Sequence, residues 1–69
     1  MVATMNTSSG PVHSGTDLKI ARVRRGIRAV DVARELGVSK QRVSQIESTT
    51  FPTRAAIRRY LAALEALST

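Results

Sequence analysis

The amino-acid sequence predicts a small all-α bundle of four helices. Apolar residues recur at helical spacing, and no stretch shows the alternation of apolar and polar residues that is typical of a strand. Glycine and proline separate the helical stretches, at Gly26, Gly37 and Pro52. The chain has 69 residues, enough for one small domain at most. We expect this domain to span residues 16–69.

Residues 1–15 differ in composition from the rest of the chain. They are small and polar, they include no Lys, Arg, Asp or Glu, and they lack apolar periodicity. This composition predicts a disordered N-terminal tail. The tail also lacks the basic start and apolar run of a secretory signal, and no later apolar run approaches the roughly 20 residues of a membrane span. With no cysteine in the chain, these features favour a soluble cytoplasmic protein without membrane contact.

The first two predicted helices end at glycines. The first places Leu18, Ala21 and Arg25 on one face, with Thr16 or Asp17 as its N-cap, and it ends at about Arg25, before Gly26. The second spans residues 29–36, with its apolar residues spaced for one face, and it closes on Gly37. The residues on that face are Val32, Ala33 and Leu36.

The third predicted helix spans residues 40–48, after Ser39 as its N-cap. Its only apolar members, Val43 and Ile46, form a narrow stripe that we expect to face inward. The opposite side is uncharged and polar, with two basic residues on its flanks. These polar residues are Gln41, Ser44, Gln45 and Ser48, and the flanking residues are Lys40 and Arg42.

The fourth predicted helix is the longest and begins at Pro52 and Thr53. A proline at 52 disfavours helical backbone at Phe51, so residues 48–51 are expected to form a loop, with Phe51 covering the junction of the last two helices. Tyr60 is expected in the core, not on a surface where bases stack. The apolar face of this helix comprises Ile57, Tyr60, Leu61, Leu64 and Leu67, and its other side carries Arg54, Arg58 and Arg59.

The charge of the chain favours a phosphate-rich partner. Eleven Lys and Arg against five Asp and Glu give a formal net charge of +6, all of it from Asp17 onward. Such a charge density is typical of nucleic-acid binding, although acidic lipid or an acidic protein would also be attracted. An enzyme is not expected, because the only histidine, His13, lies in the tail and Asp31 and Glu35 have no nucleophile beside them. No catalytic residue, metal site or cofactor is predicted.

The stretch ARELGVSKQRV, residues 33–43, has the spacing of a helix-turn-helix. Ala33 is small where the second helix of the motif crosses closely, and Gly37 permits a left-handed turn. Val38, Val43 and Ile46 are placed to fill the wedge between the two helices. Several positions in order make this pattern fairly specific.

Over residues 16–67 the chain resembles the Cro/repressor family of helix-turn-helix regulators, also called XRE-like. The resemblance implies a lambda-repressor-like bundle that binds double-stranded DNA, and an ion pair between Arg22 and Glu47. It is carried by Arg25-Gly26-Ile27, Val32-Ala33, Leu36 to Ser39, Ile46-Glu47 and Pro52-Thr53.

Two departures from the family pattern bear on DNA contacts and on dimer formation. Family members often have Ser or Thr and then Gln at the start of the second helix, where this chain has Arg28 and Ala29. The usual phosphate contact of that Gln is therefore absent, although Arg28 can take a phosphate by charge alone. A fifth helix usually completes the family core, and too few residues follow the fourth helix for one. The bundle is thus expected to have four helices, as a truncated version of five, and the dimer geometry is left open.

The resemblance and the polar residues of the third helix together predict a site that reads the major groove. Glutamine is suited to paired hydrogen bonds with adenine, and arginine and lysine to bases or phosphates. The predicted phosphate contacts are Arg28, Ser39 and Arg54. The predicted base contacts are Lys40, Gln41, Arg42, Ser44 and Gln45.

The leading functional hypothesis is a transcriptional repressor that binds a palindromic operator as a homodimer. A phage or prophage repressor and the antitoxin of a toxin pair both suit this size, in a bacterial or phage-encoded, nucleoid-associated protein. One alternative is a promoter-binding module like region 4 of sigma factors, because RVSQIE also resembles that region. The other is a protein-interaction module, in which a dimer partner, a toxin or another protein covers an apolar face formed by Leu61, Leu64 and Leu67.

Overall fold

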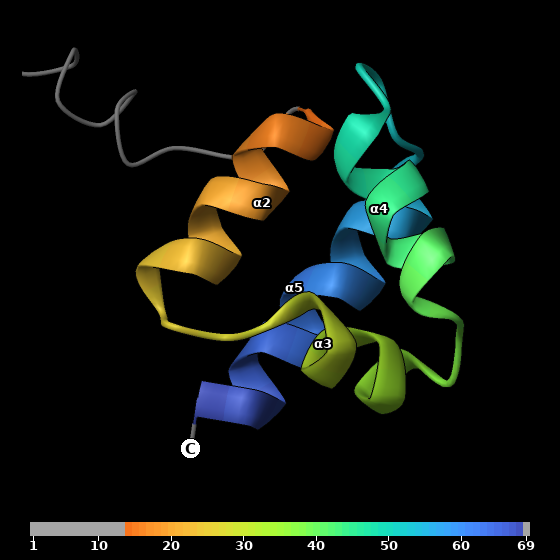
Figure 1. Cartoon of the computed structure of the whole chain (residues 1–69). Helices are drawn as coiled ribbons and strands as arrows, with labels where there is room; N and C mark the ends of the chain where they lie inside the picture. Colours follow the sequence, from red (N-terminus) through yellow and green to blue (C-terminus); the bar gives the residue numbers. More distant parts are fainter. Residues whose placement is uncertain (1–13, 69) are drawn as a thin grey trace, which may run out of the picture.

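Four α-helices make up the computed structural model, which describes residues 14–68 (Figure 1). They are α2 (Gly15–Arg24), α3 (Ala29–Leu36), α4 (Lys40–Ser48) and α5 (Arg54–Ser68). No strand occurs within residues 14–68, which confirms the all-α class. The expected disordered tail lies outside the described residues except for Ser14 and Gly15.

The first helix begins earlier than the sequence predicted. Its N-cap is Ser14, whose hydroxyl accepts the backbone N–H of Asp17 at 3.2 Å, while the Ser14 N–H donates to the Asp17 carboxylate at 3.2 Å. This reciprocal arrangement is a capping box, in which a side chain three residues inside the helix returns to the cap. The expected cap at Thr16 or Asp17 was therefore wrong, and Asp17 acts as the third helical residue.

Gly15 packs directly against the end of α4. Its N–H donates to the carbonyl oxygen of Thr49 at 2.8 Å. A Cβ at this position would lie 2.6 Å from the carbonyl oxygen of Glu47, and closer still to that of Ile46. The folded part of the chain therefore includes Ser14 and Gly15, which the sequence had assigned to the tail.

The two glycine turns and the cap of α4 agree with the predictions. Gly26 and Gly37 have φ values of 68° and 71°, in the left-handed region that glycine adopts without a steric penalty. Ser39 caps α4, and its hydroxyl accepts the N–H of Arg42 at 3.1 Å. These local signals place the end of α3 and the start of α4 where the sequence predicted them, and α2 ends at Arg24, just before Gly26.

The loop between α4 and α5 leaves Phe51 outside the bundle. Its side chain is 85% exposed, so the prediction that it covers the junction of these helices was wrong. The start of α2 lies at that end of α4 instead, through the contacts of Gly15. The helix α5 begins at Arg54, and Thr53 precedes it, with its hydroxyl accepting the N–H of Ala56 at 3.0 Å.

Every described helix contributes to a single core. The largest fully buried side chains are Leu18, Val32, Val43, Tyr60 and Leu64. The burial of Leu64 corrects its assignment to a partner-binding face, because this side chain has no exposed surface to offer. Leu61 and Leu67 are partly buried and pack against the same core. Most of the apolar face of α5 is thus used within the bundle.

A polar network joins α2, α4 and α5 beside this core. Arg22 pairs with Glu47 through Nε–Oε2 at 2.8 Å and Nη2–Oε1 at 3.3 Å, which confirms the predicted ion pair. The two side chains are 12% and 8% exposed. Arg22 also donates to the carbonyl oxygen of Ile27 at 2.9 Å, and the Tyr60 hydroxyl donates to Glu47. Since Glu47 lies in the last turn of α4, the network holds that end of α4 against the other two helices.

The network shifts the ionisation of its members. The hydrogen bond to Glu47 raises the pKa of Arg22, and burial followed by the hydrogen bond to Glu47 raises the pKa of Tyr60. A raised pKa in the folded state means that the Tyr60 phenol stabilises the fold in its protonated form. That contribution is present below the pKa of an unfolded tyrosine, about 10, and is lost as the pH rises through the higher pKa of the folded state.

Candidate nucleic-acid interface

The helices α3 and α4 form the predicted helix-turn-helix. Gly37 turns the chain at the end of α3, where the N–H of Val38 donates to the carbonyl oxygen of Ala33 at 3.0 Å. Ala33 is 4% exposed and Val43 is fully buried, so both lie in the contact between the motif and the core. A methyl group at position 33 leaves room for the close crossing of α4. The helices α3 and α4 therefore pack against each other as the helix-turn-helix spacing of residues 33–43 predicted.

One side of α4 is polar and exposed, and we call it the α4 polar face. Its neighbours on the same helix, Val43 and Ile46, point into the bundle and orient the helix. The only acidic residue of α4, Glu47, is paired with Arg22. The face therefore offers amide, hydroxyl and cationic groups but no free carboxylate. It consists of Lys40, Gln41, Arg42, Ser44 and Gln45, all of which are exposed.

Two side chains of the α4 polar face bind each other. The guanidinium of Arg42 donates from Nη1 to the side-chain oxygen of Gln45 at 3.2 Å. The sequence contained the spacing for this pair, three residues apart on a helix, but the prediction treated the two residues separately. The face is also hollowed. The residues that line this open hollow are Gln41, Arg42, Ser44, Gln45, Ser48 and Thr49.

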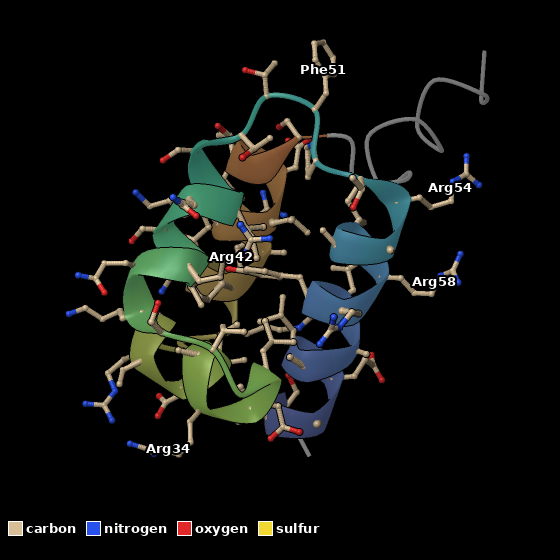
Figure 2. All side chains as sticks on the ribbon, turned by 90° about the vertical axis from the view of Figure 1, so that its right-hand side faces the viewer. Arg34, Arg42, Phe51, Arg54 and Arg58 are labelled. Atoms are coloured by element: carbon tan, nitrogen blue, oxygen red, sulfur yellow. The ribbon has the colours of Figure 1, made fainter. Side chains whose placement is uncertain are left out.

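The predicted phosphate contacts differ in their positions. The Ser39 hydroxyl caps α4 by accepting the backbone N–H of Arg42. A hydroxyl that accepts one hydrogen bond can still donate its own hydrogen, here to a phosphate. Arg28 is exposed at the N-cap of α3 and pairs with Asp31 at 3.2 Å, and this hydrogen bond lowers the pKa of Asp31. Figure 2 shows that Arg54 and Arg58 project from α5 away from α4. The structure therefore does not bring Arg54 to the α4 polar face.

The structure adds a basic residue that the sequence did not single out. Lys19 on α2 is exposed and lines a second open hollow, together with Ser44 and Ser48 of α4. Thr16 and Glu47 complete its lining. No local signal marks Lys19, because its nearness to α4 depends on how α2 packs across the bundle.

Residues 14–68 include no group of three or more His, Cys, Asp or Glu side chains placed to hold a metal ion. No helix among them is both long and apolar enough to cross a bilayer.

Comparison with known proteins identifies the family. A family model described as a helix-turn-helix domain matches residues 15–68, which include all four described helices. Neither the curated proteins nor the solved structures gave a significant match. The matched range starts at the glycine that packs on α4 and ends with the last residue of α5. The chain therefore belongs to this family of XRE-like helix-turn-helix domains, whose members are DNA-binding regulators.

Proposed function

We propose that the protein is a sequence-specific regulator of transcription that contacts the major groove of double-stranded DNA through the α4 polar face. One observation carries the proposal: five adjacent polar or cationic side chains of α4 are exposed, while Val43 and Ile46 anchor the same helix in the bundle. A helix presented in this way fits the width of the major groove, about 12 Å. No unpaired carboxylate of α4 would repel a phosphate backbone, because Glu47, the only acidic residue of this helix, is bound to Arg22.

The residues of this face have distinct proposed roles. We assign Gln41 and Gln45 to the base edges, because an amide both donates and accepts, as adenine requires. Lys40 and Arg42 contact bases or phosphates from the flanks of the helix, and Ser44 lies between them. Because Arg42 is bonded to the side-chain oxygen of Gln45, we expect these two residues to act as a unit.

Selection of bound sequences from random duplex DNA, at a fixed salt concentration, tests the proposal. We expect a short motif to be enriched. Binding that tracks only the salt concentration, with no enriched motif, would show that the protein binds DNA without specificity.

Replacing Gln45 with Ala is expected to lose roughly 1 to 3 kcal/mol of discrimination at one base position. The reason is that alanine retains the helix but removes the amide that pairs with a base edge. The measurement is a set of binding titrations against the selected site and its single-base variants. Glu65→Ala is the control, because this exposed residue lies on α5. An equal loss on all sequences would make Gln45 a positioning contact only.

Lys19 and Arg54 give a matched pair of charge removals. Lys19→Ala is expected to reduce the slope of log affinity against log salt concentration by about 0.9, the effect of one lost phosphate contact. Arg54→Ala removes the same charge from a side chain that points away from α4, and we expect the slope to stay unchanged. Titrations at four or more salt concentrations measure both slopes. Equal reductions in the two variants would assign the effect to net charge and not to position.

We further propose that the protein acts as a repressor and binds a palindromic operator as a homodimer. One short recognition helix covers only a few base pairs, and two half-sites about one helical turn apart supply the missing specificity. Leu61 and Leu67, which are only partly buried, are the remaining candidates for a face that meets a second copy or a protein partner such as a toxin. Sedimentation with and without operator DNA tests this, and one protein per operator at saturation would contradict the homodimer.

A further inference from the structure

The most exposed large apolar side chain of residues 14–68 is Phe51. It is 85% exposed, compared with 58% for Val23, 47% for Ile20 and 37% for Val30. Figure 2 shows it projecting from the end of the bundle, away from every helix. Covering such a ring removes a large apolar area from water, which favours a contact with something outside the monomer.

The loop that carries Phe51 is held in place on both sides. Before it, the Thr49 carbonyl oxygen accepts the N–H of Gly15 at 2.8 Å, and the Thr49 hydroxyl donates to the carbonyl oxygen of Gln45 at 2.7 Å. After it, Thr53 caps α5 through the N–H of Ala56 at 3.0 Å. The ring is therefore presented from a short segment that is anchored to three helices.

This loop continues the α4 polar face. The open hollow on that face is lined by residues from Gln41 to Thr49, so a ligand lying along α4 reaches the start of the loop. The sequence has no acidic residue between Glu47 and Glu65, and Glu47 is already paired. A polyanion is favoured next to this surface, whereas a second copy brings the same net charge of +6 to it.

We propose that Phe51 makes an apolar contact with duplex DNA at the edge of the major groove, next to the bases contacted by α4. The inference rests on the proposed function. The surfaces that DNA offers to a phenyl ring there are thymine methyl groups and deoxyribose carbons. Such a contact adds affinity without displacing counterions, so it differs from the lysine and arginine contacts in its response to salt.

A single tryptophan at this position reports directly on coverage. The chain contains no Trp, so Phe51→Trp introduces the only one. We expect acrylamide to quench its fluorescence efficiently in the free protein and several-fold less in the saturated DNA complex. Glu65→Trp is the control, because Glu65 is exposed on α5, and its quenching is expected to stay the same when DNA binds. A tryptophan at 51 that remains equally accessible in the complex would overturn the proposal. Protection that grows with protein concentration in the absence of DNA would also overturn it, in favour of a second copy.

Affinity measurements separate this inference from the proposed function. Phe51→Ala is expected to weaken binding by about tenfold with an unchanged salt slope, an effect of the size that burial of an aromatic ring provides. Replacing thymine with deoxyuridine in the selected site then distinguishes a methyl contact, which is lost, from a sugar contact, which remains. If the unaltered protein binds labelled DNA and Phe51→Ala binds it equally well, the inference alone fails. If the unaltered protein binds no duplex DNA, the proposed function fails and this inference fails with it.

Discussion

Replacing Glu47 with Ala is expected to lower the free energy of unfolding by about 3 kcal/mol, since it leaves a nearly buried charge without its partner. Glu47 receives hydrogen bonds from both Arg22 and Tyr60, and the Arg22 side chain is only 12% exposed. Without the carboxylate, the guanidinium retains only uncharged partners in the network, the carbonyl oxygen of Ile27 and the Tyr60 hydroxyl. Urea unfolding, followed by far-UV circular dichroism, measures the loss.

Two variants control this expectation. Glu65→Ala removes an exposed carboxylate from α5 and is expected to change stability by less than about 0.5 kcal/mol. The double variant Arg22→Met with Glu47→Leu removes both charges, and we expect it to recover much of the lost stability, because no unpaired charge remains. A Glu47→Ala effect as small as that of Glu65→Ala would show that the ion pair contributes little to the fold.

Gly15→Ala is expected to destabilise the protein by about 3 kcal/mol, although alanine normally favours a helix over glycine by roughly 0.5 to 1 kcal/mol. The added Cβ would meet the carbonyl oxygens of Ile46 and Glu47, which are backbone atoms within α4 and cannot move aside alone. The contact between α2 and α4 would have to open. The same unfolding measurement detects the effect as a fall in the transition midpoint.

Gly26→Ala and Gly37→Ala are the matched comparisons for this variant. Both glycines have positive φ, but nothing lies within 4 Å of a Cβ at either position. Their substitution is therefore expected to cost only the backbone penalty, roughly 1 to 2 kcal/mol. A Gly15→Ala protein as stable as the unaltered one would mean that α2 and α4 are not in the close contact described.

The parts of the fold that were predicted correctly depend on signals close together in the chain. Gly37 ends α3 and Ser39 starts α4, and both act within a few residues of the backbone groups that they satisfy. The same holds for the polar and apolar sides of α4, because Val43 and its exposed neighbours all lie within about one helical turn of one another. The pairing of Arg22 with Glu47 joins residues far apart in the sequence, so its two partners came from the family resemblance, while the position of Glu47 beside the inward stripe of its helix favoured a partly buried pair.

The predictions that were wrong or missing concern contacts between residues far apart in the chain. Phe51 was expected inside and is outside, Leu64 was expected at a surface and is in the core, and Lys19 was not singled out. Each depends on which helix lies opposite, and that information is absent from the residues nearby. The start of α2, for example, occupies the end of α4 that Phe51 was expected to cover.

The sequence by itself determined that this chain is helical, where its two glycine turns lie, and which side chains of α4 stay free of the core. Tertiary structure alone decided that the α4 backbone leaves no room for a side chain at Gly15. It also decided that Tyr60 joins the network of Arg22 and Glu47, and that Phe51 faces outward. The physical reason is range. Caps and helical periodicity act over about one turn, whereas close packing and buried hydrogen bonds depend on atoms that only folding brings together.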